Sequence, residues 1–104
     1  VLLEVNVAEE SQKAGVVPAE VASLLERVAG IEGLEARGLM CIPPVGEGRR
    51  WFAALRSLVE DLRSSTGLEL PELSMGMSAD FEDAILEGAT LVRVGTAIFG
   101  PRAD

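Results

Sequence analysis

Residues 72–100, ELSMGMSADFEDAILEGATLVRVGTAIFG, decide the fold that this chain is predicted to adopt. The stretch predicts a strand, a glycine-containing turn, a short helix and a second strand that is apolar apart from one arginine and a Gly-Thr pair. This pattern is typical of a βαβ unit, in which polar groups follow the carboxyl ends of both strands. Ser78 is expected to be the N-cap of the helix that Asp80 and Phe81 begin.

The ends of these two strands carry candidate ligands for a phosphate. Backbone N–H groups at Ser78, and at Gly95 and Thr96 after the second strand, are predicted to converge on one anion. Glycine permits close approach of the backbone, and threonine adds a hydroxyl donor. Acidic residues in the first turn of the same helix repel a phosphate, and the N-cap role of Ser78 needs no ligand. The Gly95-Thr96 pair at the end of the last strand favours the phosphate site over a plain N-cap role of Ser78.

The remaining strands are predicted from apolar, β-branched runs. Residues 1–7 form one such run, and residues 35–42 form another that ends firmly at Pro43-Pro44. The last strand includes residues 91–94, where Arg93 interrupts an apolar sequence. A charge at such a place costs several kcal/mol unless it is paired or bonded to a ligand. We expect Arg93 to be more than half buried, and a salt bridge with Glu4 on the first strand is the alternative to a ligand.

Three helices are predicted from apolar residues at helical spacing. The first runs from Pro18 to a stop at Gly30, the second covers residues 49–65, and the third covers residues 79–87. Their apolar stripes are Val21, Leu24, Leu25 and Val28 in the first, Phe52, Leu55, Leu58, Val59 and Leu62 in the second, and Phe81, Ala84 and Ile85 in the third.

The order of elements, β-α-β-α-β-α-β, predicts an α/β fold with parallel strands and right-handed crossovers. In such sheets ligands bind at the carboxyl ends of the strands. Two architectures fit the order: a small open sheet, or half of a TIM-type (β/α)8 barrel, whose full length is typically about 250 residues.

The composition restricts the possible functions. A chain of 104 residues is at most one domain, and a net charge of −8 disfavours nucleic acid and anionic membranes as partners. The apolar runs are far shorter than the ~20 residues of a membrane span, and with no leader pattern a cytoplasmic location is expected. The sequence has no histidine, which excludes the usual histidine-containing zinc sites and catalytic triads. The single cysteine, Cys41, is expected to be a buried, unreactive thiol.

The motif Leu73–Asp80, followed by Val92–Gly100, resembles the C-terminal signature of the pyridoxal-phosphate homeostasis proteins. Two earlier pieces agree with it: Val5–Val7 with Lys13–Gly15 behind it, and Gly38–Pro43. The resemblance runs through the whole chain in order and covers about the second half of that family's chain. Val1 is accordingly expected to lie inside a longer native sequence.

This resemblance implies a barrel like the N-terminal domain of alanine racemase, with residues 1–104 as a single domain that forms its C-terminal half. It implies pyridoxal phosphate as cofactor, bound by Ser78, Arg93, Gly95 and Thr96, with Met77 packing beside the site. In the resembled family the arginine faces the pyridine nitrogen of the cofactor. A permanently charged donor there keeps that nitrogen unprotonated and weakens the ring as an electron sink.

The residue that would do covalent chemistry is not predicted within this chain. The resemblance implies a Schiff-base lysine on an early barrel strand, upstream of Val1, and Lys13, the only lysine, lies in a loop that matches a different motif. We therefore expect a carrier or homeostasis role in vitamin B6 and amino-acid metabolism, without turnover. The alternatives are a racemase-like enzyme acting on amino acids and an α/β domain that binds another phosphorylated ligand. Residues 1–104 alone are expected to self-associate through open sheet edges.

Overall fold

The computed structural model describes residues 1–11, 13–44 and 46–94, and its elements alternate as the sequence predicts. They are β1 (Leu2–Glu4), the 3-10 helix η1 (Pro18–Glu20), α1 (Val21–Ala29), β2 (Gly38–Met40), α2 (Gly48–Thr66), β3 (Glu72–Met77), α3 (Phe81–Leu86) and β4 (Leu91–Arg93). The predicted site residues Gly95 and Thr96 lie outside the described residues.

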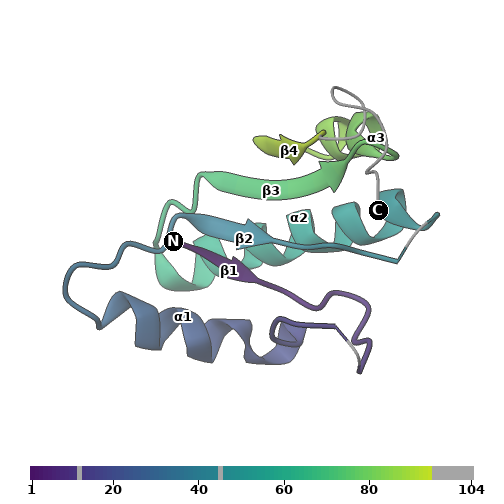
Figure 1. Cartoon of the computed structure of the whole chain (residues 1–104). Coiled ribbons are helices and arrows are strands. Elements are labelled where there is room, and N and C mark those ends of the chain that lie inside the picture. Colours follow the sequence, from purple (N-terminus) through teal and green to yellow (C-terminus); the bar gives the residue numbers. More distant parts are fainter. Residues whose placement is uncertain (12, 45, 95–104) are drawn as a thin grey trace.

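The four strands form one parallel sheet in the order β1-β2-β3-β4. In Figure 1 the strands run side by side, with α2 behind β2 and β3 and α1 along the β1 side. The predicted α/β class with parallel strands is confirmed. Because neighbouring strands are also consecutive in sequence, each helix serves as a crossover between two adjacent strands.

Strands β1 and β2 are shorter than the predicted runs over residues 1–7 and 35–42. At the end of β1 the chain turns to pair with its own following loop: the Asn6 N–H donates to the Val16 carbonyl (2.8 Å), and the Val16 N–H donates to the Glu4 carbonyl (3.0 Å). Gly15 permits this approach with φ 97°, since a Cβ there would lie 2.9 Å from the Glu4 carbonyl oxygen. Local pairing with a loop thus replaces the last part of the expected strand.

The register of the sheet separates an apolar face from a mixed face. Leu3, Leu39 and Leu73 lie in one row across β1, β2 and β3, and all three are buried in the core. Glu4, Met40 and Ser74 form the next row, one position along each strand. Since successive side chains of a strand point to opposite faces, this second row lies on the face opposite the core. We call it the open face.

The helix stripes predicted for the first two helices are confirmed. Val21 and Leu25 of α1 are buried, as are Phe52, Leu55, Val59 and Leu62 of α2, and all join one core cluster with the apolar row of the sheet. Leu24, Val28 and Leu58 are partly buried against the same cluster. Helix α1 ends at Gly30, the predicted stop.

The third helix differs from its prediction in three respects. It has six residues, Phe81–Leu86, in place of the predicted range 79–87, and its N-cap is Asp80, so the N-cap assignment of Ser78 is wrong. Ile85 was expected in the core and is 55% exposed, whereas Ala84 is buried. Residues 78–80 form a turn before the helix, so the helix begins later than predicted.

Gly76 is the residue that lets α3 lie directly on β3. Its φ is 101°, and a Cβ there would meet the Ala84 Cβ at 2.6 Å. The register of β3 with β4 is irregular at the same place: Ser74 pairs with Leu91 and Met77 pairs with Arg93. Three steps along β3 therefore match two steps along β4, which is the signature of a bulge. This bulge ends β3 beside the end of β4.

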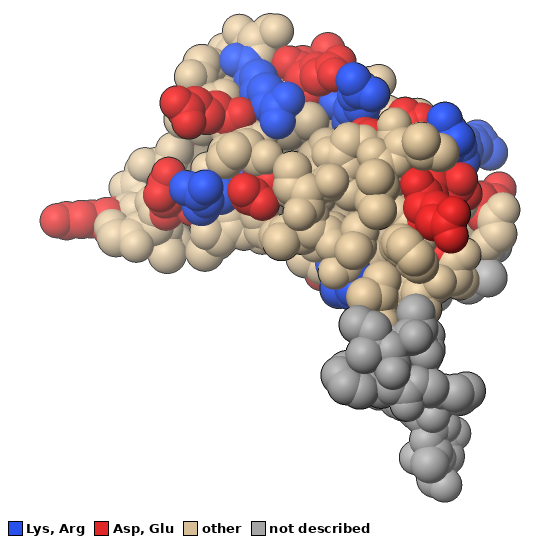
Figure 2. All heavy atoms as spheres, turned by 90° about the horizontal axis from the view of Figure 1, so that it is seen from above, with Lys and Arg blue, Asp and Glu red and all other residues tan. Residues whose placement is uncertain are grey.

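The surface carries charges of both signs. Figure 2 shows acidic and basic side chains interspersed on one side of the molecule, with uncharged surface between them. No helix within the described ranges is long and apolar enough to cross a membrane.

Candidate functional site

Arg93, the last residue of β4, is hydrogen-bonded both to β3 and to the residue that follows β2. Its Nη1 donates to the hydroxyl of Ser74 on β3 (2.7 Å), and its Nη2 donates to the backbone carbonyl of Cys41 just after β2 (3.1 Å). The side chain is partly buried, as expected from its place in an apolar strand. The guanidinium thus reaches across β3 to β2 on the side of the sheet to which Ser74 points.

The alternative salt bridge between Arg93 and Glu4 is not formed. The ion pairs within the part of the chain that the structure describes do not join these two residues, and the hydrogen bonds of Arg93 go to Ser74 and Cys41. β1 and β4 are separated by three strand spacings, or roughly 14 Å at about 4.8 Å each, and the Arg93 side chain ends at its contacts with Ser74 and Cys41, before it reaches β1. That interpretation of Arg93 is wrong.

Cys41 contributes its backbone to the site while its thiol stays in the core. The residue is fully buried, as the sequence predicts. Burial raises the pKa of the thiol from 9.0 to about 12, and the nearby positive charge of Arg93 opposes that rise in part. A thiol with so high a pKa is a poor nucleophile at neutral pH.

A tight turn connects β3 to α3 and holds Met77 and Ser78. The Asp80 backbone N–H donates to the Met77 carbonyl (3.1 Å), and the Met77 N–H donates to Oδ1 of Asp80 (2.8 Å). Asp80 also packs against the start of α2, because a Cβ on Gly48 would lie 2.9 Å from its Oδ2. The Asp80 carboxylate therefore closes the turn and occupies one backbone donor at the end of β3.

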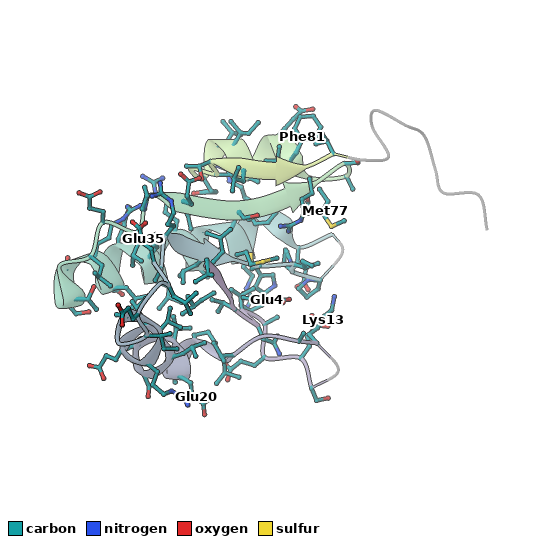
Figure 3. All side chains as sticks on the ribbon, turned by 60° about the vertical axis from the view of Figure 1, so that its left-hand side comes forward. Glu4, Lys13, Glu20, Glu35, Met77 and Phe81 are labelled. Carbon is teal, nitrogen blue, oxygen red and sulfur yellow. The ribbon has the colours of Figure 1, made fainter. Side chains whose placement is uncertain are left out.

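The structure brings together three of the five predicted site residues. Met77 and Arg93 are partners in the β3–β4 register, and Ser78 follows Met77 directly. Met77 is 46% exposed, so it borders the surface of this edge. Figure 3 shows Met77 at the end of the molecule toward which the strand arrows point, while Glu35 lies at the opposite end. The other two predicted residues, Gly95 and Thr96, fall in the part of the chain that is not described.

Lys13 lies at the same end of the molecule as Met77 (Figure 3). It is exposed in the loop that follows β1, and its backbone N–H donates to the Glu10 carbonyl (3.1 Å). That loop is tied down by Asn6, whose amide side chain donates to the Glu10 carbonyl (2.6 Å) and accepts from the Glu10 N–H (3.0 Å). The Val5–Val7 motif thus shapes the loop that presents Lys13.

Two residues of this edge were not assigned a role from the sequence. Both belong to the Leu73–Asp80 motif, and Asp80 is predicted to begin the third helix, but neither is predicted to make a contact at the site. The signal for Ser74 was a polar residue inside an otherwise apolar strand, beside a second strand with a buried arginine. The signal for Asp80 was its spacing of three from Met77, which suits a side chain that closes a turn.

The donors at this edge fit a ligand that carries hydrogen-bond acceptors. A guanidinium offers N–H donors and no acceptor, and its charge is permanent. Ser74 and Cys41 account for two of the five N–H bonds of Arg93. Within the described ranges no three side chains are grouped so as to hold a metal ion. The chemistry of the edge favours an organic or inorganic anion over a cation.

A protein-family comparison covers nearly the whole chain. The family model described as "Alanine racemase, N-terminal domain" matches residues 1–103. Among curated proteins, a pyridoxal phosphate homeostasis protein of Aquifex aeolicus is 47% identical, over 98% of this chain and 46% of its own length. One of Pseudomonas aeruginosa is 49% identical, over 98% of this chain and 44% of its own length. The chain thus spans just under half the length of these relatives.

Two solved structures of similar proteins also match nearly the whole of this chain. PipY of Synechococcus elongatus, without PLP, superposes with a TM-score of 0.86 at 39% identity, over 95% of this chain and 48% of its own. The structure of PipY with PLP bound superposes with a TM-score of 0.82 at 38% identity. The parallel α/β unit therefore corresponds to about half of a TIM-barrel-like fold, as the sequence predicts.

Proposed function

Because the chain belongs to the family of alanine racemase N-terminal domains, we propose that it binds pyridoxal 5′-phosphate at the carboxyl edge of its sheet. Its role in this proposal is that of a carrier in vitamin B6 and amino-acid metabolism, without turnover. The native protein acts in the cytoplasm with neither nucleic acid nor membrane as partner. Residues 1–104 form one domain, the C-terminal half of the cofactor-binding barrel.

The names of the relatives support this choice of ligand. The Aquifex aeolicus and Pseudomonas aeruginosa proteins are both called pyridoxal phosphate homeostasis proteins, and PipY has been solved with PLP bound. Their identities of 38 to 49% extend over 95 to 98% of this chain, so the likeness covers nearly all of it.

The single observation that carries the proposal is the anchoring of Arg93. Its guanidinium is held by the Ser74 hydroxyl and the Cys41 carbonyl, and Met77, the last residue of β3, is the partner of Arg93 in the strand register. A fixed cation of this kind, beside a turn and at the carboxyl ends of parallel strands, is where this architecture binds phosphorylated ligands. Arg93 is the residue that would contact the ring of the cofactor.

When bound, pyridoxal phosphate supplies an electron-withdrawing ring that activates amino acids joined to its aldehyde. Arg93 limits this capacity, because a donor with a permanent charge leaves the ring nitrogen unprotonated. The chain's own contribution is therefore to bind and orient the cofactor. Ser78, Gly95 and Thr96 would hold the phosphate through backbone N–H and hydroxyl groups, and Met77 would pack beside it.

The experiment is a titration of the native protein with pyridoxal phosphate, followed by visible absorbance and by retention on dialysis. We expect tight binding that Arg93→Ala weakens by about 10- to 100-fold, because a hydrogen bond to a charged group contributes about 1.5–3 kcal/mol. Arg37→Ala is the matched control, since Arg37 precedes β2 at the opposite end of the sheet. It should leave the affinity unchanged.

Three outcomes would contradict the proposal or the part that Arg93 has in it. Absence of pyridoxal phosphate binding would refute it outright. Competition by inorganic phosphate together with equal affinity for other phosphorylated compounds would favour the alternative of a general phosphate-binding α/β domain. Equal loss of affinity in Arg93→Ala and Arg37→Ala would remove Arg93 from the site.

A further inference from the structure

Ser74 is a buried polar residue that faces away from the core. It is 5% exposed, and the register places it beside Met40, in the row that continues to Glu4 on the open face of the sheet. Its hydroxyl accepts the 2.7 Å hydrogen bond from Nη1 of Arg93. A buried hydroxyl needs a partner, and here that partner is the cation proposed to contact the cofactor.

The two terminal nitrogens of the Arg93 guanidinium are bound by two different segments of the chain. Nη1 is bound to a side chain of β3, and Nη2 is bound to the Cys41 carbonyl after β2. Since the guanidinium is planar, two contacts at different nitrogens determine its plane as well as its position. The backbone N–H of Cys41 in turn donates to the Ser74 carbonyl (3.1 Å), which joins the two anchors to one another.

The β3 bulge contributes to this arrangement. Ser74 pairs with Leu91, and the extra residue in β3 places Met77, rather than Gly76, beside Arg93. Leu91 and Arg93 are two residues apart on β4, so both point to the side on which Ser74 lies. The long arginine side chain can therefore reach back along the sheet to the hydroxyl.

We infer that Ser74 is a positioning residue for Arg93, which sets the orientation in which the guanidinium meets the ring of the bound cofactor. The inference rests on the proposed function for the identity of the ligand. It goes beyond that function by assigning a role to a residue that is not itself expected to touch the cofactor. Ser74 acts through Arg93 alone.

A double-mutant cycle in the native protein tests this assignment. Ser74→Ala removes the acceptor and should weaken pyridoxal phosphate binding by about 5- to 10-fold, with a shifted absorbance maximum of the bound cofactor. Ser74→Thr, which keeps a hydroxyl, should restore both. In the Arg93→Ala background Ser74→Ala should change the affinity by less than about twofold, because its effect passes through Arg93. Ser57→Ala, on the exposed side of α2, is the matched control.

A second measurement needs no cofactor. The NMR order parameter of the Arg93 Nε–H bond should fall in Ser74→Ala and recover in Ser74→Thr. An unchanged order parameter in Ser74→Ala, or an equal loss of affinity in both Arg93 backgrounds, would overturn the inference. If the wild-type protein does not bind pyridoxal phosphate while the order parameter still depends on Ser74, then the proposed function fails and the positioning of Arg93 by Ser74 stands.

Discussion

The carboxylate of Asp80 accepts a 2.8 Å hydrogen bond from the backbone N–H of Met77, at the edge of the sheet where a phosphate is proposed to bind. The Met77 N–H is therefore bound to a carboxylate of the protein and is not free to bind a phosphate. The remaining phosphate contacts must come from groups beyond Met77. The same carboxylate lies against Gly48, so α2, β3 and α3 meet at this one side chain.

Asp80 is predicted to have separable effects on stability and on ligand binding. Asp80→Ala should lower the free energy of unfolding by about 1 kcal/mol, because the Met77 N–H loses its acceptor. Asp80→Asn keeps an acceptor oxygen, so it should cost less stability, and it should strengthen phosphate binding because a nearby like charge is removed. Urea denaturation and titration with pyridoxal phosphate measure the two effects. Equal destabilisation by Asn and Ala would show that the hydrogen bond does not hold the turn.

Gly38 is predicted to tolerate no side chain. A Cβ there would lie 1.7 Å from the carbonyl oxygen of Glu72, its partner in the β2–β3 register. Gly38→Ala should destabilise the protein by more than about 3 kcal/mol, since the two strands cannot keep their pairing distance. Gly30→Ala is the control, because its Cβ would meet its nearest atoms at 3.6 Å. Comparable melting temperatures for the two variants would contradict this account.

Because the pKa of the Cys41 thiol is raised in the folded protein, we predict that the protein loses stability at alkaline pH. Its pKa is about 12 in the folded protein against 9.0 for an unperturbed thiol, so above pH 9 the unfolded chain releases a proton that the folded chain retains. The free energy of unfolding should therefore fall as the pH rises from 9 toward 12. Urea denaturation at a series of pH values measures the slope. Cys41→Ala should have a shallower slope, and an identical slope would refute the role of the thiol.

Lys13 is predicted not to be the residue that bonds the cofactor covalently. It is exposed in a loop after β1, whereas the family resemblance implies a lysine upstream of Val1. Borohydride treatment of the native protein with pyridoxal phosphate, followed by peptide mapping, should leave Lys13 without stoichiometric label. Lys13→Arg should retain full labelling elsewhere. Stoichiometric label on Lys13 would reverse the assignment.

The features that the sequence predicted correctly depend on local patterns. Apolar residues at intervals of three and four identified the buried faces of α1 and α2, because helix periodicity is a property of consecutive residues. Alternation of strands and helices gave the parallel order, since a crossover helix leaves few other connections. The burial of Cys41 followed from an apolar strand in the same way.

The tertiary structure decided where the strands stop and what Arg93 contacts. The sequence by itself determined the class of fold, the order of its elements and the presence of a charge at the end of the last strand. It did not determine that this charge meets Ser74, 19 positions away, and Cys41, 52 positions away, rather than Glu4. Nor did it identify Asp80, in place of Ser78, as the N-cap of α3. Such contacts depend on strand order, register and a bulge, which arise only when distant segments pack against one another.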